Sequence, residues 1–335
     1  MIASATIQNL GNIAAADLSG LSKINLVIGE NDTGKTMLLK ALYVLSRSLE
    51  EFQKGKDPRS YKEVLADKLY WTFQVEKIGE LVSKDRREGF ELNAVIDDQS
   101  VRFGFSQSAK KSITSVSESV SHRSKNSIFL PAKEVLGLFS VIKKSRGIDN
   151  EFGFDDTYYD LVKALEKDSR QGNNFRDFAE GKRLLKGLVK GRMEYKNGEW
   201  SFEKGKMKIP IHSTAEGIKK IAILDRLLSN RYITPGSIIY IDEPESVLHP
   251  KAIVQFLDII TLLANRGIQV FMATHSYFVL KKMLLLAREN DMDIPVFSMA
   301  NGTATRYNLK DGMPENPIVD TSIELYEQEL DMELS

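Results

Sequence analysis

Residues 27–42, VIGENDTGKTMLLKAL, constrain the fold of this chain more than any other stretch. Residues 29–36 fit the pattern G-x-x-x-x-G-K-[ST], with a strand-like run before them and a helix-like run after them. The glycines let the backbone curl until its N–H groups point inward, and the following helix adds the partial positive charge of its N-terminus. The segment therefore predicts a phosphate-binding loop at the start of an α/β nucleotide-binding fold.

The residues of this loop have separate expected roles. We expect Lys35 to reach the β- and γ-phosphates and Thr36 to hold Mg²⁺ through its hydroxyl. The residues expected to contact the nucleotide are Gly29, Glu30, Asn31, Asp32, Thr33, Gly34, Lys35, Thr36 and Met37. A kinase, a GTPase, a transporter motor and a switch protein could all use such a loop, so the loop alone does not fix the function.

An acidic pair follows a second apolar run, in SIIYIDEPE. Residues 238–241 predict a buried parallel strand, and Asp242 and Glu243 come at its carboxyl end, where open α/β sheets place their ligands. We expect Asp242 to bind Mg²⁺, directly or through water, and Glu243 to orient and deprotonate the attacking water. The alternative is an ordinary acidic pair at a solvated strand end.

His275 is the third catalytic candidate beside Glu243 and Lys35. It ends the apolar run VFMATHS, one helix and one strand after the acidic pair, and this position predicts a hydrogen bond to the γ-phosphate. The alternative is a histidine on the surface or a satisfied one in the core.

In STAEGIKKIAIL, a turn of small residues leads directly into a helix. Such a start predicts a second anion-binding helix N-terminus. A second cradle is useful if it is presented to the nucleotide of another subunit, whereas the alternative is an ordinary capped helix. The candidate residues are Ala215, Glu216 and Gly217.

The hydrophobic periodicity predicts one α/β domain over residues 1–335. Strands are expected at residues 3–10, 23–29, 127–130, 237–243 and 268–276. Hairpins are expected at 90–106, at 192–202 and around Asn301-Gly302. Helices are expected after residue 36, over most of 133–190, at 213–228 and 252–264, after Tyr277 and at the acidic C-terminal end. The expected core comprises residues 1–49 and 206–335, with an inserted β-hairpin and helical region at 50–205.

The composition excludes several classes of protein. The chain has no cysteine, which excludes disulfides, thiolate zinc sites and cysteine nucleophiles. It has no secretory signal and no long apolar run, so we expect a soluble, cytoplasmic protein without membrane contact. Its formal net charge is +0, so contact with DNA would need a local basic patch. The best candidate patch is Lys182, Arg183, Lys186, Lys190 and Arg192.

The motifs GENDTGKT, TAEGIKK, IIYIDEPESVLHP and MATHS occur in this order. In this respect the chain resembles the ABC-type AAA family ATPases, a branch that includes RecF, structural-maintenance-of-chromosomes proteins and the ATPase part of OLD-family nucleases. FLPAKEVL and FDDTYYDL make it most similar to bacterial OLD-like ATPases.

The resemblance implies a P-loop fold of ABC-ATPase type with ATP and Mg²⁺ as ligands. It implies that Lys35 and Thr36 belong to Walker A, Asp242 and Glu243 to Walker B, and His275 to the switch. Residues 246–249 would form the D-loop. ATP would then lie between two protomers, each presenting residues 215–217 to the phosphate loop of the other.

Three features depart from the family pattern. The signature reads AEG where SGG is usual, so the serine contact to the γ-phosphate is either missing or supplied by Ser213 or Thr214. Lys133 and Glu134 stand where a Q-loop glutamine is expected. The short region after His275 lacks the acidic pattern of a Toprim nuclease, so we expect an OLD-like ATPase without that domain.

Two functions follow from this reading. The first is an ATP-hydrolysing switch that forms a homodimer or higher assembly and controls a separate effector, such as a nuclease or toxin, in bacterial anti-phage defence. The alternative is a RecF-like ATPase that binds DNA in repair. A transporter motor is disfavoured by the long insertion.

Overall fold

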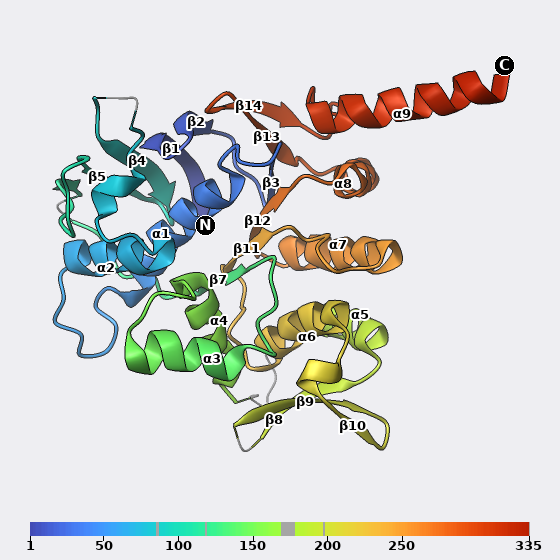
Figure 1. The fold of residues 1–335 in the computed structure, drawn as a ribbon, viewed down its shortest axis with the longest axis horizontal. Coiled ribbons are helices and arrows are strands. Elements are labelled where there is room, and N and C mark those ends of the chain that lie inside the picture. The colour runs from blue at the N-terminus through green and yellow to red at the C-terminus, as the bar shows by residue number, and fades with distance from the viewer. Residues whose placement is uncertain (85–86, 118, 169–177, 197, 335) are drawn as a thin grey trace.

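The structure, a computed structural model, describes residues 1–84, 87–117, 119–168, 178–196 and 198–334. Within these ranges the strands form one mixed sheet of 11 strands and a second sheet of 3 (Figure 1). The order in the large sheet is β6-β5-β4-β1-β2-β14-β13-β3-β12-β11-β7, and in the small sheet β10-β9-β8. The predicted mixed sheet of an α/β fold is confirmed.

The element bounds are as follows. The strands are β1 Ile2–Leu10, β2 Ile13–Leu18, β3 Ile24–Gly29, β4 Phe90–Ile96, β5 Gln99–Phe105, β6 Ser115–Val116, β7 Ser127–Leu130, β8 Arg192–Lys196, β9 Glu199–Lys204, β10 Met207–Pro210, β11 Ile238–Asp242, β12 Gln269–Thr274, β13 Pro295–Ala300 and β14 Thr303–Asn308. The helices are α1 Lys35–Glu51, α2 Tyr61–Phe73, α3 Phe139–Lys144, α4 Asp156–Glu166, α5 Ala179–Val189, α6 Glu216–Ser229, α7 Pro250–Asn265, α8 Tyr277–Glu289 and α9 Pro317–Leu334. Short helical turns occur at Ile78–Leu81, Ser145–Asp149 and Ile211–Ser213.

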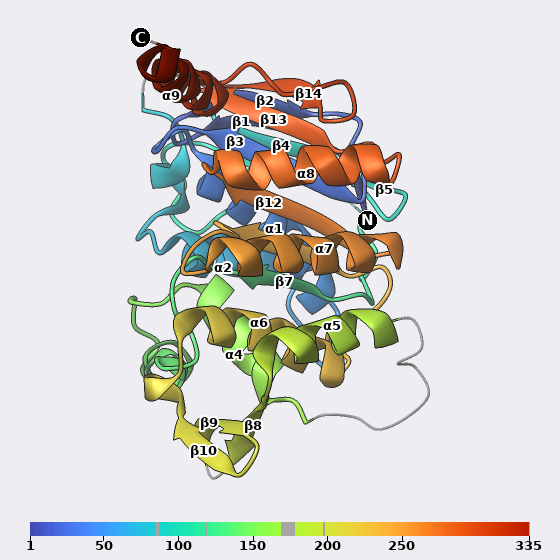
Figure 2. The ribbon, with the colours of Figure 1, turned by 90° about the vertical axis from the view of Figure 1, so that its right-hand side faces the viewer.

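The strands β7, β11, β12, β3 and β13 pair in parallel and carry the predicted phosphate loop at one end. They are mostly apolar and buried along nearly their whole length, because helices cover both of their faces. On β12, Val270 and Met272 pack in the cluster with α7 and α8, while Phe271 and Ala273 pack in the cluster with α1. Figure 2 shows α7 and α8 side by side over one face of the sheet.

The remaining strands of the large sheet are mostly antiparallel. The hairpin β4–β5 pairs as predicted and turns at Asp97 and Asp98, both of which have positive φ. Strand β2 was not predicted, because IAAADL has little apolar bulk; it pairs with β1 after a tight turn at Gly11. A long antiparallel extension thus flanks the parallel strands.

The range 50–205, predicted as an insertion, contributes to both sheets. Its strands β4 to β7 belong to the large sheet, and its helices α2 to α5 pack beside it. The hairpin β8–β9 pairs as expected, although its turn residue Asn197 lies outside the described residues. Strand β10 pairs with β9, so the small sheet crosses residue 205. The core and insertion boundaries remain a prediction.

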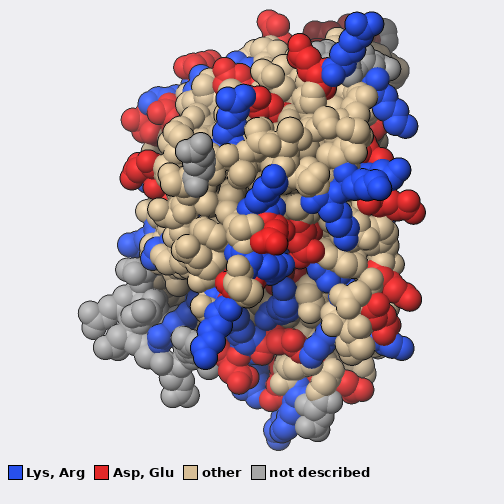
Figure 3. All heavy atoms as spheres, turned by 90° about the vertical axis from the view of Figure 1, so that its left-hand side faces the viewer, with Lys and Arg blue, Asp and Glu red and all other residues tan. Residues whose placement is uncertain are grey.

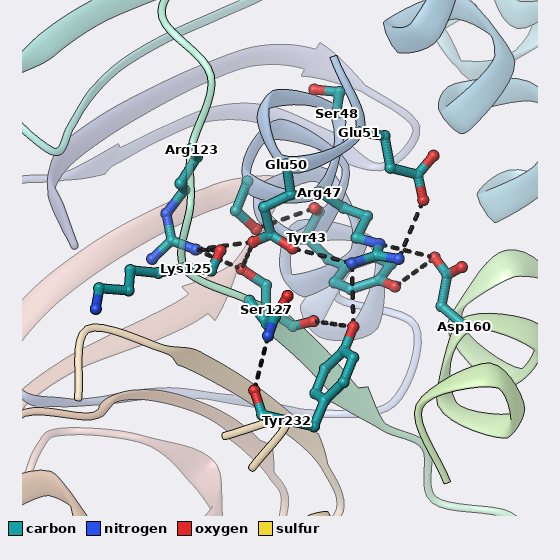
Figure 4. Close-up of polar contacts among 12 residues, drawn as sticks. Tyr43, Arg47, Ser48, Glu50, Glu51, Arg123, Lys125, Ser127, Asp160 and Tyr232 are labelled. Atoms are coloured by element: carbon teal, nitrogen blue, oxygen red, sulfur yellow. Dashed lines mark hydrogen bonds and ion pairs between the residues drawn. The ribbon is translucent and has the colours of Figure 1, made fainter. Parts of the chain in front are cut away.

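A buried polar network joins α1 to the elements around it (Figure 4). Arg47 on α1 contacts Glu50 Oε2 at 3.0 Å, the Tyr232 hydroxyl at 3.0 Å and Asp160 Oδ2 of α4 at 3.3 Å. Lys68 on α2 contacts the same Asp160 oxygen at 2.8 Å. Burial alone would raise the pKa of Asp160, but Lys68 and Arg47 hold that pKa well below its ordinary value. Removing one partner of such a network typically costs about 3–5 kcal/mol, so α1 and α4 are firmly joined.

Candidate functional site

The phosphate loop closes tightly around two glycines. Gly29 has φ 150° and Gly34 has φ 91°, values that L-side chains rarely adopt. A Cβ at Gly29 would lie 2.6 Å from the Met299 carbonyl oxygen, and one at Gly34 would lie 2.7 Å from Ile13 Cγ1. Both positions therefore need glycine, and Gly34 directly precedes the first turn of α1.

Lys35 lies at the loop that was predicted to hold phosphate. Its Nζ donates to the carbonyl oxygens of Gly29 at 2.8 Å and Glu30 at 2.6 Å. Burial lowers the pKa of Lys35, although Asp242 counteracts this by favouring the charged form. The loop, Asp242 and Glu243 line one cavity of about 440 Å³.

Thr36 and Asp242 lie together, as the two motifs predict for a metal site. The Thr36 hydroxyl donates to the two Asp242 carboxylate oxygens at 3.0 and 3.1 Å. Burial raises the pKa of Asp242. A nearby cation would counteract this by favouring the charged carboxylate. A hydroxyl and a carboxylate beside a phosphate loop are hard oxygen ligands that fit Mg²⁺.

Glu243 lies next to His275, on the adjacent strand end. Glu243 Oε1 is 3.5 Å from His275 Nδ1, and the two side chains are 38% and 45% exposed. The backbone of Glu243 is left-handed, with φ 47°. It is held by its own N–H, which donates to the Ala273 carbonyl oxygen at 2.9 Å, and by Lys220 Nζ, which donates to the Glu243 carbonyl oxygen at 2.6 Å.

Sequence reasoning missed two supporting residues, Lys220 and Glu245. Burial lowers the pKa of Lys220 to about 8. Glu245 accepts from the Thr274 hydroxyl at 2.8 Å and from the His275 N–H at 3.3 Å, so it fixes the end of β12. The second glutamate of DEPE was a signal for Glu245, whereas the Lys220 contact depends on how α6 packs.

The start of α6 carries the second predicted cradle. Ala215 is exposed, and as the N-cap residue it makes no side-chain capping bond. A Cβ on Gly217 would lie 3.0 Å from Leu248 Cδ2 and 3.1 Å from the Val247 carbonyl oxygen, so α6 packs closely on the predicted D-loop. The start of α6 at Ala215 thus lies at the surface of the protein.

A second cavity, of about 460 Å³, lies on the other side of the acidic pair. Asp242 and Glu243 line it together with Glu216 of α6, and with Lys133 and Glu134 at the expected Q-loop position. The structure therefore brings the acidic pair between the phosphate loop and the start of α6.

The predicted D-loop makes ordinary structural contacts. The Ser246 hydroxyl donates to the Ala132 carbonyl oxygen at 3.2 Å, and His249 caps α7 by accepting from the Lys251 N–H. These contacts connect the segment after Walker B to the strand β7 and to α7.

The basic residues predicted as a DNA-contact patch lie on α5, at its C-cap residue Lys190 and at the start of β8. Arg192 forms an ion pair with Glu203 at 2.6 Å, and burial lowers the pKa of Lys182. Figure 3 shows another face of the molecule, on which basic and acidic side chains are interspersed. Among the described helices, none is long and apolar enough to span a bilayer.

A family model described as "AAA domain, putative AbiEii toxin, Type IV TA system" matches residues 24–281. The chain belongs to this AAA domain family. The match includes all the catalytic candidates and the start of α6. The prediction of an ABC-type AAA ATPase is confirmed, while the OLD-like subtype remains a prediction.

Two solved structures are similar to this AAA protein in fold. One is the SMC head bound to the C-winged helix domain of ScpA, with 15% identity, a TM-score of 0.52 and coverage of 92% of this chain and 97% of that chain. The other is the recombination mediator protein RecF-ATPrS of the RecFOR pathway, with 14% identity, a TM-score of 0.50 and coverage of 91% of this chain and 98% of that chain. At this identity the likeness shows the fold alone.

Proposed function

We propose that this chain binds ATP with Mg²⁺, hydrolyses it, and uses bound ATP to join two copies of itself. The contact between Glu243 and His275, 3.5 Å apart beside the phosphate loop, carries the hydrolytic part. A carboxylate so placed can take a proton from water, and the histidine beside it is positioned to contact the transferred phosphoryl group.

The reaction follows from the positions of the side chains. Backbone N–H groups of residues 29–36 and the Lys35 ammonium hold the phosphates. Thr36 and Asp242 would hold Mg²⁺, which neutralises charge on the phosphate oxygens. Water attacks the γ-phosphorus and gives a proton to Glu243, the bond to the β-phosphate oxygen breaks, and ADP and phosphate leave.

The dimer rests on the start of α6. Residues 215–217 are proposed to complete the ATP site of the second copy, with Ala215 and Gly217 close to its γ-phosphate. The exposure of Ala215 and the uncapped helix start support this arrangement. Bound ATP then stabilises the dimer by mass action.

We further propose that the dimer controls a separate effector in the bacterial cytoplasm, such as a nuclease or toxin in anti-phage defence. The family description, which names a toxin of a toxin–antitoxin system, supports this role. A RecF-like role in DNA repair is the alternative; its candidate patch is partly neutralised, because Arg192 is paired with Glu203.

Glu243→Gln tests the proposal. The amide keeps the size of the side chain but cannot take a proton, so hydrolysis should fall by about 100-fold or more while ATP still binds. Light scattering with ATP and Mg²⁺ should then show twice the monomer mass, and without ATP the monomer mass. An unchanged mass with confirmed ATP binding would overturn the shared site.

A further inference from the structure

The helix α9 leaves the body of the protein, as Figure 1 shows. Its start is anchored, because Asn316 Nδ2 donates to the Ser298 hydroxyl at 2.8 Å and Val319 is only 6% exposed. Every residue from 323 to 333 is exposed. A helical segment of this length is marginal in water on its own, so a binding partner would stabilise it.

The exposed part of α9 carries an apolar stripe. Val319, Ile323, Tyr326 and Leu330 follow one another at spacings of four, three and four, the repeat that one helix uses to pack along another. Ile323 is 47% exposed, Tyr326 60% and Leu330 37%. The stripe therefore continues from the buried Val319 into solvent.

The charges of α9 indicate what can cover this stripe. The helix has six acidic residues and no basic one, namely Asp320, Glu324, Glu327, Glu329, Asp331 and Glu333. A second α9 would bring like charges together along the seam, and a nucleic acid or an anionic lipid surface would be repelled. A helix with basic residues beside its own apolar stripe would match both the shape and the charge.

We propose that α9 is the docking helix for a separate protein, which presents an amphipathic helix with an apolar stripe flanked by Lys and Arg. The inference rests on the proposed function for the existence of a separate effector. Burial of Tyr326, Ile323 and Leu330 supplies the apolar contact, and the acidic flanks select the partner by its charge.

Two peptides test the chemistry of the partner on the full chain. One carries four heptads with Ile and Leu in the stripe and Lys and Arg beside it; the other has Glu in place of these basic residues. By fluorescence anisotropy, the basic peptide should bind, and more weakly at high salt, while the acidic peptide should not. Equal binding of both peptides, or binding of neither, would overturn the proposal.

Adjacent residues on α9 provide a matched pair of variants. Tyr326 lies on the stripe and is 60% exposed, whereas Leu325 lies off the stripe and is 62% exposed. Tyr326→Ser should weaken binding of the basic peptide at least tenfold, about the effect of losing one buried side chain, while Leu325→Ser should change it less than threefold. Circular dichroism and ATP binding confirm that both variants fold. Equal losses would contradict docking along the stripe.

Photo-crosslinking in the native host identifies the natural occupant. A photoreactive phenylalanine at position 326 should crosslink to a basic amphipathic helix of another protein, and one at position 325 should not. Crosslinks from 326 to a second copy or to a segment without basic residues, or no crosslink at all, would overturn the inference. If the basic peptide does not bind while Glu243→Gln still forms ATP-dependent dimers, only the docking proposal is wrong. If the peptide binds but these dimers do not form, only the proposed switch is wrong.

Discussion

The two parts of the candidate site differ in how far the chain completes each of them by itself. At the phosphate loop, Lys35 contacts two loop carbonyls and Thr36 contacts Asp242. At the start of α6, Ala215 is exposed and makes no side-chain cap. The first part is preorganised by hydrogen bonds within the chain, whereas at the second part the N-cap residue Ala215 makes no side-chain capping bond.

Lys220 connects these two parts. It lies on α6, one turn after residues 215–217, and its ammonium holds the carbonyl oxygen of Glu243. Under the proposed function, binding of the second copy's ATP at the start of α6 would therefore affect the position of Glu243, the catalytic base of the first copy. Under this proposal, Lys220 thus links the part that binds ATP to the part that forms the dimer.

The largest effect is expected from breaking the part that binds ATP. Lys35→Ala removes the cation from the loop, and loss of one such electrostatic contact typically costs about 100- to 1,000-fold in turnover. The fold should stay intact, because within the described part of the chain the Lys35 ammonium donates hydrogen bonds to two loop carbonyls and to no helix or core side chain. An ATPase assay and circular dichroism test both points; unchanged turnover would contradict the assignment of the loop.

A second change should break only the part that forms the dimer. Ala215→Glu places a carboxylate at the exposed α6 start, so it should repel the phosphates of a second copy while ATP binding to the monomer is unchanged. This site is a cleaner test than Gly217, where any Cβ would crowd Leu248. In the Glu243→Gln background, Ala215→Glu should abolish the ATP-dependent dimer seen by light scattering. Thr114→Glu, a control at an exposed bend just before β6, should preserve it.

The smallest effect should come from the connection between the two parts. Lys220→Met keeps the aliphatic length but releases the Glu243 carbonyl, so kcat should fall about tenfold, as expected for a misplaced catalytic group, with ATP affinity unchanged. Lys220→Arg should restore part of the rate. Lys219→Met removes the adjacent buried lysine, which pairs with Glu216 at 2.8 Å, and should change kcat less than threefold. Equal losses in both methionine variants would mean a general packing effect.

Local sequence patterns predicted much of this fold and named the candidate residues of its site. The phosphate loop and the strands β11 and β12 depend on contiguous residues, so their pattern survives without tertiary information. Strand β2 escaped detection because alanines in IAAADL give a weak strand signal. The contact between Lys220 and the Glu243 carbonyl depends on where α6 packs relative to β11, and no local pattern encodes it.

The buried network around Arg47 also has a consequence for synthesis of the protein. Asp160, which pairs with Arg47 and Lys68, follows Arg47 by 113 positions in the chain. In a nascent chain that ends before α4, Arg47 and Lys68 can pair with Glu50 and Glu51 but lack the Asp160 contact that joins them to α4. The ribosome thus makes the phosphate loop early, but α1, the helix that follows it, gains its buried contacts to α4 only after α4 has emerged.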